Sequence, residues 1–221
     1  MEIRTNLAHQ SNYGKARETS GIKYIVIHYT ANNGDTARDN AIYFSRNENL
    51  SASAHYFVDE KEVWQSVMDN YTAWHCGANT YKHPNCRNAN SIGVELCSRK
   101  DSSGNYYFKE DVVANAVILT KELMKKYNIP TENVIRHYDV TGKICPAPMV
   151  NDESLWKGFL SMLSNKKLES GNDIVWELIN GKYKIKIDDV HRAVNALDKA
   201  KDNQEFMSLY WILYKLVNEN R

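Results

Sequence analysis

Short runs of consecutive apolar residues recur along the first 165 residues and are separated by polar stretches. The run at 22–28 is rich in β-branched residues and is typical of a buried strand. The runs at 54–58, 91–97 and 134–137 predict further strands. A turn over 59–61 leads back into a further apolar stretch and predicts a β-hairpin. These segments predict a sheet whose strands are contributed from distant parts of the chain.

Helical periodicity appears between these runs. Residues 110–127 place their apolar side chains on one face, and Pro130 ends that pattern. Thr36 and Asp39 have the spacing of a helix-starting capping box, and a last amphipathic helix follows Trp156. Strands that alternate with helices predict an α/β domain over residues 1–165, with the helices packed on the sheet.

The pattern changes after Lys166. Residues 173–180, 188–200 and 202–219 all show helical spacing. We therefore expect residues 168–221 to form a separate, small all-α domain.

Composition and charge exclude several classes of protein. The chain has 28 basic and 27 acidic residues and lacks a basic stripe, which argues against nucleic-acid binding. No apolar run approaches the roughly 18 residues of a membrane-spanning helix, and no signal-peptide stretch is present. We expect a chain made in the cytoplasm that does not insert into a membrane.

The four cysteines, at positions 76, 86, 97 and 145, form no Cys-x-x-Cys pair. Without an export signal, buried reduced thiols are the expectation for Cys76, Cys86 and Cys97. A Cys76–Cys86 disulfide is the alternative. Residues 69–90 form a long segment without periodicity, which favours a functional loop.

Three residues combine into a candidate metal site. His28 and His137 each end a predicted strand, and Cys145 follows eight residues later in a Pro-flanked loop. Histidine nitrogen and cysteine sulfur are typical zinc ligands, and a catalytic zinc keeps three protein ligands with a fourth position open. Taken alone, each residue also fits a structural role in the core.

Five segments, in order, resemble the type-2 N-acetylmuramoyl-L-alanine amidases, a family of bacterial and phage cell-wall enzymes related to the peptidoglycan-recognition proteins. Together they cover roughly residues 21–150. The segments are Tyr24-Ile-Val-Ile-His-Tyr-Thr-Ala, Ser53-Ala-His-Tyr, Ala73-Trp-His-Cys-Gly, Ser91-Ile-Gly-Val-Glu-Leu and the His137-x5-Lys-x-Cys-Pro stretch. The resemblance implies a mixed central β-sheet flanked by helices.

The resemblance also implies a set of site residues. His28, His137 and Cys145 would bind one zinc ion, and Glu95 would accept the proton of the attacking water. Strand alternation turns Glu95 away from its apolar neighbours, toward a face that a site can occupy. Lys143 would stabilise the oxyanion together with zinc.

The sequence leaves the roles of His55, Trp74 and His75 open. Some phage members of the family use a tyrosine in place of the acid, and His55 falls at about that position. Trp74 and His75 would shape the substrate groove, orient a metal ligand through a hydrogen bond, or simply pack the loop. His75 and Cys76 are also candidates for a fourth ligand, which would make the zinc structural.

We expect hydrolysis of the amide bond between N-acetylmuramic acid and L-alanine in bacterial peptidoglycan. Peptidoglycan lies outside the membrane, whereas the chain shows no signal peptide. This combination favours a phage or prophage endolysin, which is released by a holin or by lysis. The alternatives are a non-catalytic peptidoglycan-recognition module and a cytosolic muropeptide-recycling amidase. Aromatic residues in 168–221 favour a cell-wall-binding module, with packing against the first domain or homo-oligomer formation as alternatives.

Overall fold

The computed structural model describes residues 2–164, Gln204 and Trp211. Its centre is a six-stranded sheet in the order β1-β5-β4-β7-β3-β10. The strands of this sheet are β1 (Ile3–Thr5), β3 (Tyr24–Tyr29), β4 (Tyr56–Val58), β5 (Val63–Gln65), β7 (Ser91–Leu96) and β10 (Val134–Arg136). All neighbours pair in parallel except the β4–β5 hairpin, which is antiparallel. The predicted mixed sheet and the predicted hairpin are confirmed.

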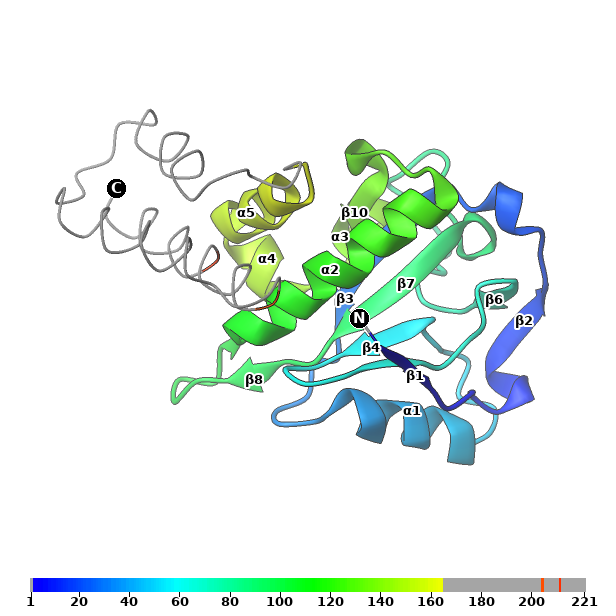
Figure 1. Ribbon diagram of the computed structural model, residues 1–221, viewed down its shortest axis with the longest axis horizontal. Coiled ribbons are helices and arrows are strands. Elements are labelled where there is room, and N and C mark those ends of the chain that lie inside the picture. The colour runs from blue at the N-terminus through cyan, green and yellow to red at the C-terminus, as the bar shows by residue number, and fades with distance from the viewer. Residues whose placement is uncertain (1, 165–203, 205–210, 212–221) are drawn as a thin grey trace, which may run out of the picture.

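Five α-helices lie around the sheet within the described residues (Figure 1). They are α1 (Ala37–Arg46), α2 (Glu110–Tyr127), α3 (His137–Thr141), α4 (Ala147–Asn151) and α5 (Glu153–Ser164). α1 begins with the predicted capping box, in which the Thr36 side chain accepts a hydrogen bond from the Asp39 backbone N–H at 3.1 Å. α2 spans the predicted range and ends at Asn128, which adopts a left-handed conformation with φ of 51°.

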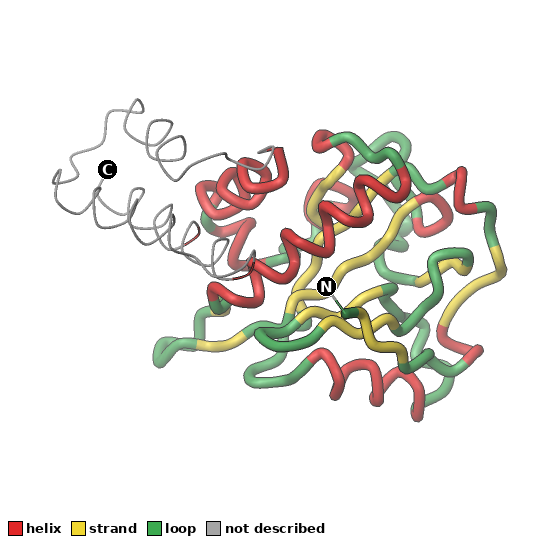
Figure 2. Tube along the Cα trace, in the orientation of Figure 1, coloured by secondary structure: helices red, strands yellow, loops and turns green. Residues whose placement is uncertain are grey.

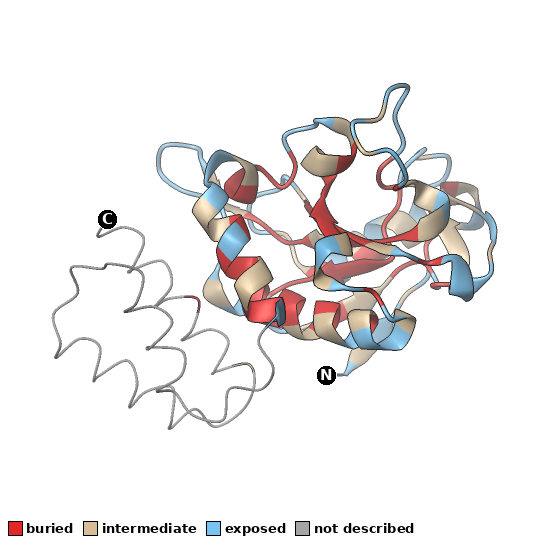
Figure 3. Ribbon diagram, turned by 90° about the horizontal axis from the view of Figure 1, so that it is seen from above, coloured by how far each residue is buried: buried red, intermediate tan, exposed pale blue. Residues whose placement is uncertain are grey.

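One face of the sheet carries the main hydrophobic core. Ile92, Val94 and Leu96 of β7 point to this face and are fully buried beneath α2 and α5. Figure 3 shows the buried strands beneath helices whose outer surfaces are exposed. Since side chains alternate along a strand, Gly93 and Glu95 must point to the other face, as predicted.

The second face is covered by α1 and by loops rather than by long helices. Ala37 of α1 packs with Ala54, Phe57 and Cys97 in a smaller apolar cluster. The connections drawn without regular structure in Figure 2 complete this layer. The site described below lies on this second face.

The structure adds short elements that the sequence pattern did not predict. β2 (Tyr13–Ala16) pairs antiparallel with β6 (Tyr71–Ala73), and β8 (Arg99–Lys100) pairs with β9 (Tyr106–Tyr107). The described 3-10 helices are η1 (Gln10–Asn12), η2 (Thr19–Gly21), η3 (Asn88–Asn90) and η4 (Thr131–Asn133). His137, expected to end a strand, instead begins α3, and α4 covers the end of the expected irregular loop. Residues 142–146 between the two helices form a loop as predicted.

The predicted C-terminal helical domain lies outside the described residues except for two positions. Trp211 is 1% exposed and belongs to the apolar cluster beneath α2 and α5. The Gln204 side chain donates a hydrogen bond to the backbone carbonyl of Glu60 at 3.2 Å. No helix among the described residues is both long and apolar enough to cross a membrane.

Candidate metal centre and active site

The candidate ligands meet at the carboxyl ends of parallel strands. His28 lies near the end of β3, opposite Glu95 of β7 in the strand register. Arg136 of β10 pairs with Ile27 of β3, so that His137 follows at the level of His28. Cys145 reaches the same place from the loop between α3 and α4, where its carbonyl accepts a hydrogen bond from the Tyr138 backbone N–H at 2.9 Å.

The three side chains form a compact group that could hold a metal ion. One ligand atom from each of His28, His137 and Cys145 lies within 4.8 Å of the others. The His28 Nδ1 to Cys145 Sγ distance is 3.6 Å. His137 Nδ1 is buried and has no hydrogen-bond partner among the described residues, as expected of an atom reserved for a cation. Two imidazoles and one thiol are a donor set that suits zinc.

Burial sets the protonation states of the ligands. It lowers the pKa of His137 to about 4 and the pKa of His28 well below its ordinary value, so both rings are neutral and able to bind a metal. Burial, with the Glu95 carboxylate as a smaller cause, raises the pKa of Cys145 to about 12. The thiolate therefore requires a nearby cation.

Glu95 stands directly beside this group. Its Oε1 lies 3.9 Å from His28 Nδ1, and its Oε2 is buried without a hydrogen-bond partner among the described residues. Burial raises the pKa of Glu95 to about 8, while Lys143 acts to lower it and Asp35 to raise it. A carboxyl group poised near neutral pH can both accept and return a proton.

The group opens into a cavity of about 790 Å³. His28, Glu95, His137, Lys143 and Cys145 all line it, so the structure brings together every predicted ligand and both predicted catalytic residues. Ligand pockets in proteins are typically of this size.

Comparison with known protein families gives a match over most of the described residues. A family model described as N-acetylmuramoyl-L-alanine amidase matches residues 18–148. The chain belongs to this amidase family. The resemblance inferred from the five segments is thereby confirmed.

Individual relatives agree with this assignment. N-acetylmuramoyl-L-alanine amidase CwlL from Bacillus licheniformis is 39% identical over 160 residues, which are 66% of this chain and 43% of CwlL. The chain thus spans less than half the length of that relative. The structure of PlyL is 34% identical with a TM-score of 0.62, and covers 76% of this chain and 100% of PlyL. A mutant endolysin from Bacillus subtilis is 31% identical with a TM-score of 0.60, and covers 74% of this chain and 99% of its own.

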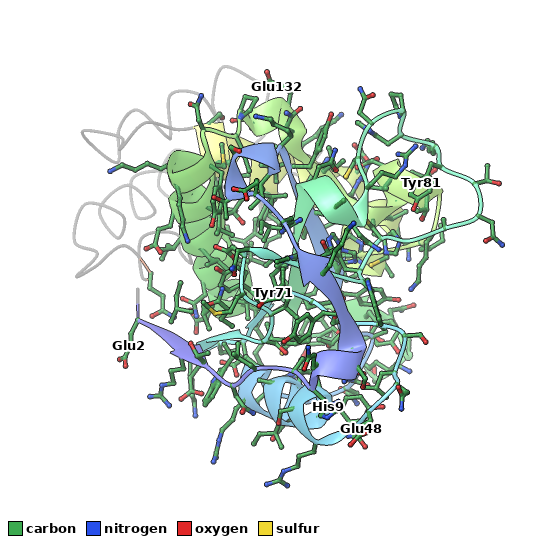
Figure 4. The ribbon with its side chains drawn as sticks, turned by 90° about the vertical axis from the view of Figure 1, so that its right-hand side faces the viewer. Glu2, His9, Glu48, Tyr71, Tyr81 and Glu132 are labelled. Atoms are coloured by element: carbon green, nitrogen blue, oxygen red, sulfur yellow. The ribbon has the colours of Figure 1, made fainter. Side chains whose placement is uncertain are left out.

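Trp74 and His75 both line the cavity of this member of the amidase family. They follow β6 at the start of a loop whose far part, marked by Tyr81 in Figure 4, extends to one side of the sheet. His75 Nδ1 lies 3.0 Å from His28 Nε2. Neither His75 nor Cys76 belongs to the candidate metal group among the described residues, so a fourth protein ligand finds no support there.

His55 is placed differently. Its ring is completely buried and is not among the residues that line the cavity. The Gly93 backbone N–H donates to His55 Nδ1 at 3.0 Å, and Arg17 and the Tyr71 carbonyl flank its Nε2. Tyr71 marks this side of the molecule in Figure 4. The structure thus separates His55 from this cavity.

One residue that lines the cavity was not predicted from the sequence. Asp35, in the polar loop after β3, lines the cavity and accepts hydrogen bonds from Thr30, Asn32 and Asn40. The Asn- and Asp-rich composition of that loop is the feature of the sequence that could have indicated a site residue there. All four cysteines are buried, and none is joined to another in the structure. Reduced thiols at Cys76, Cys86 and Cys97 stay a prediction.

Proposed function

We propose that this chain is a zinc-dependent amidase that hydrolyses the bond between N-acetylmuramic acid and L-alanine in bacterial peptidoglycan. The observation that carries the proposal is the placement of Glu95 in one cavity with a three-residue zinc-type donor set, where its partly buried carboxyl group lies 3.9 Å from His28 Nδ1. The chain's membership of the amidase family supports the choice of this bond.

His28, His137 and Cys145 would hold the ion. When bound, zinc supplies Lewis-acid chemistry by lowering the pKa of a water molecule and polarising the substrate carbonyl. Glu95 accepts the proton of the attacking water and then donates it to the departing alanine nitrogen. Lys143 places a positive charge on the same cavity wall, where negative charge develops on the carbonyl oxygen.

The test is digestion of purified peptidoglycan with the metal-loaded protein. We expect muramic acid free of peptide together with stem peptides that carry a new N-terminal alanine. Cys145→Ser is the matched control and should release neither. New reducing sugar ends without new N-terminal alanine would contradict the proposal, and binding without any cleavage would favour a recognition module.

We further propose an endolysin role, which is supported by the similarity of this chain to the mutant endolysin from Bacillus subtilis. Cells that produce the chain should stay intact until a pore-forming protein opens their membrane, and should then lyse. A recycling amidase would instead cleave soluble muropeptides and leave intact sacculi undigested.

Residues 168–221 are proposed to attach the enzyme to the cell wall. The support is their surplus of aromatic residues and the gain in effective concentration that a second attachment gives on an insoluble polymer. Trp211 is used in packing instead. The Cys145→Ser chain should pellet with sacculi, whereas the same chain ended after Ser164 should stay in the supernatant. Circular dichroism shows whether the shortened chain, which lacks the buried Trp211, keeps its fold. Equal pelleting would refute attachment, and light scattering would then test for a dimer.

A further inference from the structure

A continuous series of hydrogen bonds leads away from the candidate metal ligand His28. His28 Nε2 lies 3.0 Å from His75 Nδ1, and His75 Nε2 lies 3.1 Å from Ser91 Oγ. The Ser91 hydroxyl donates to the Arg87 backbone carbonyl at 2.7 Å. The series thus ends on a backbone carbonyl, which can accept a hydrogen bond but cannot donate one.

Only one direction of donation satisfies all of these contacts. A carbonyl oxygen only accepts, so the Ser91 hydroxyl hydrogen is committed to Arg87 and its oxygen accepts from His75 Nε2–H. A neutral imidazole carries one N–H, so His75 Nδ1 is an acceptor, and His28 must donate from Nε2. His28 Nδ1 is then unprotonated, and this is the atom that faces Cys145 at 3.6 Å.

Contacts with Asn88 and Gly93 hold His75 in this position. The Asn88 side chain accepts hydrogen bonds from the backbone N–H groups of His75 and Cys76 at 3.2 and 2.8 Å. The His75 ring occupies the space in which Gly93 lacks a side chain, because a Cβ atom there would lie 2.6 Å from His75 Cγ. The ring meets that of His28 edge to face, with centroids 5.1 Å apart.

We propose that His75 is a positioning residue for the metal centre: it holds His28 in the Nε2–H tautomer and thereby presents Nδ1 to the zinc ion. The inference rests on the proposed zinc-dependent function. Hydrogen bonding of a ligand histidine to a second group orients the ring and increases metal affinity, and removal of such a partner typically costs about 10–100-fold in that affinity.

The first test uses the unaltered chain. A two-bond proton–nitrogen correlation spectrum of the zinc-loaded protein distinguishes protonated, bare and metal-bound imidazole nitrogens. We expect His28 with Nε2–H and metal-bound Nδ1, and His75 with Nε2–H and bare Nδ1. A protonated His75 Nδ1, or a His28 bound to metal through Nε2, would overturn the proposal.

The second test compares two substitutions that differ in a single property. Asparagine can place its Oδ1 near the position of His75 Nδ1 and still accept from His28, whereas leucine removes the acceptor but fills similar space. Competition with a chelator of known affinity should show zinc binding about 10–100-fold weaker in His75→Leu. His75→Asn should recover most of that loss. His83→Leu is the control, because His83 accepts hydrogen bonds in the same loop but is not bonded to a ligand.

The outcomes separate this inference from the function on which it rests. If the unaltered chain binds no zinc, the proposed metal-dependent function fails. If it binds zinc and His75→Leu binds equally tightly, the function stands and the positioning role is refuted. Equal weakening of zinc binding in His75→Leu and His75→Asn would also refute it, since the acceptor would then be irrelevant. Urea denaturation of the metal-free variants shows whether each remains folded.

Discussion

Substitution of Glu95 by glutamine should stabilise the metal-free protein while it removes catalysis. Burial raises the pKa of this carboxyl group from 4.5 to about 8. The folded state therefore binds the Glu95 proton more tightly than the unfolded state does. That contribution to stability is complete below pH 4.5 and is lost as the pH rises to about 8.

The magnitude follows from this difference in pKa. At about 1.4 kcal/mol per pKa unit, the full penalty for the ionised carboxylate is roughly 5 kcal/mol. The side chain keeps 20% exposure, so water lowers the penalty. We expect Glu95→Gln to exceed the parent in free energy of unfolding by about 2–3 kcal/mol above pH 8. The two proteins should differ much less at pH 4.5.

Urea denaturation at several pH values between 4.5 and 9, in the presence of a chelator, measures this difference. The chelator is essential because a bound cation would favour the carboxylate. Glu132→Gln, at an exposed side chain, controls for the loss of one negative charge. A difference between Glu95→Gln and the parent that does not grow with pH would refute the reasoning.

Other changes test the remaining parts of the structure. With zinc bound, Glu95→Gln should lower the hydrolysis rate about 10²–10⁴-fold while zinc content stays unchanged. Cys145→Ser should contain much less zinc by elemental analysis, and equal zinc content would contradict its role as a ligand. Lys143→Met should lower the rate about 10²–10³-fold, measured by release of N-terminal alanine. Asp69→Ala should lower the free energy of unfolding by about 2–4 kcal/mol without changing zinc content, because this buried carboxylate accepts hydrogen bonds from Tyr56, Tyr127 and Lys126.

The sequence predicted the parts of the fold that apolar runs and helical stripes specify. β3, β7 and α2 belong to this class, because their apolar residues form one core. β2 and β6 could not be read from periodicity, since they are short and depend on distant contacts. The Arg17 side chain, just after β2, donates hydrogen bonds to the backbone carbonyls of Asp69, Asn88 and Ser91. No local sequence pattern predicts such bonds.

The same distinction applies to the site. His28, His137 and Cys145 were predictable because His28 lies near the end of β3, His137 directly follows β10, and His137 and Cys145 share a recognisable motif. The sequence left the role of His75 open because its hydrogen-bond partners lie 47 residues before it and 16 residues after it. The place of His55 was equally undetermined, since only the folded chain shows that its ring faces Arg17 instead of the cavity.

Trp211 has a consequence for how the protein unfolds. Its indole shares an apolar cluster with Trp156 and Phe159 of α5 and Val113 of α2, although it lies 47 residues beyond the end of α5. Residues that share one core lose their packing together, so melting of α2 and release of Trp211 should be the same event. Urea unfolding followed by helix content and by the solvent exposure of the Trp211 indole should therefore give coincident transitions, and not two independent ones.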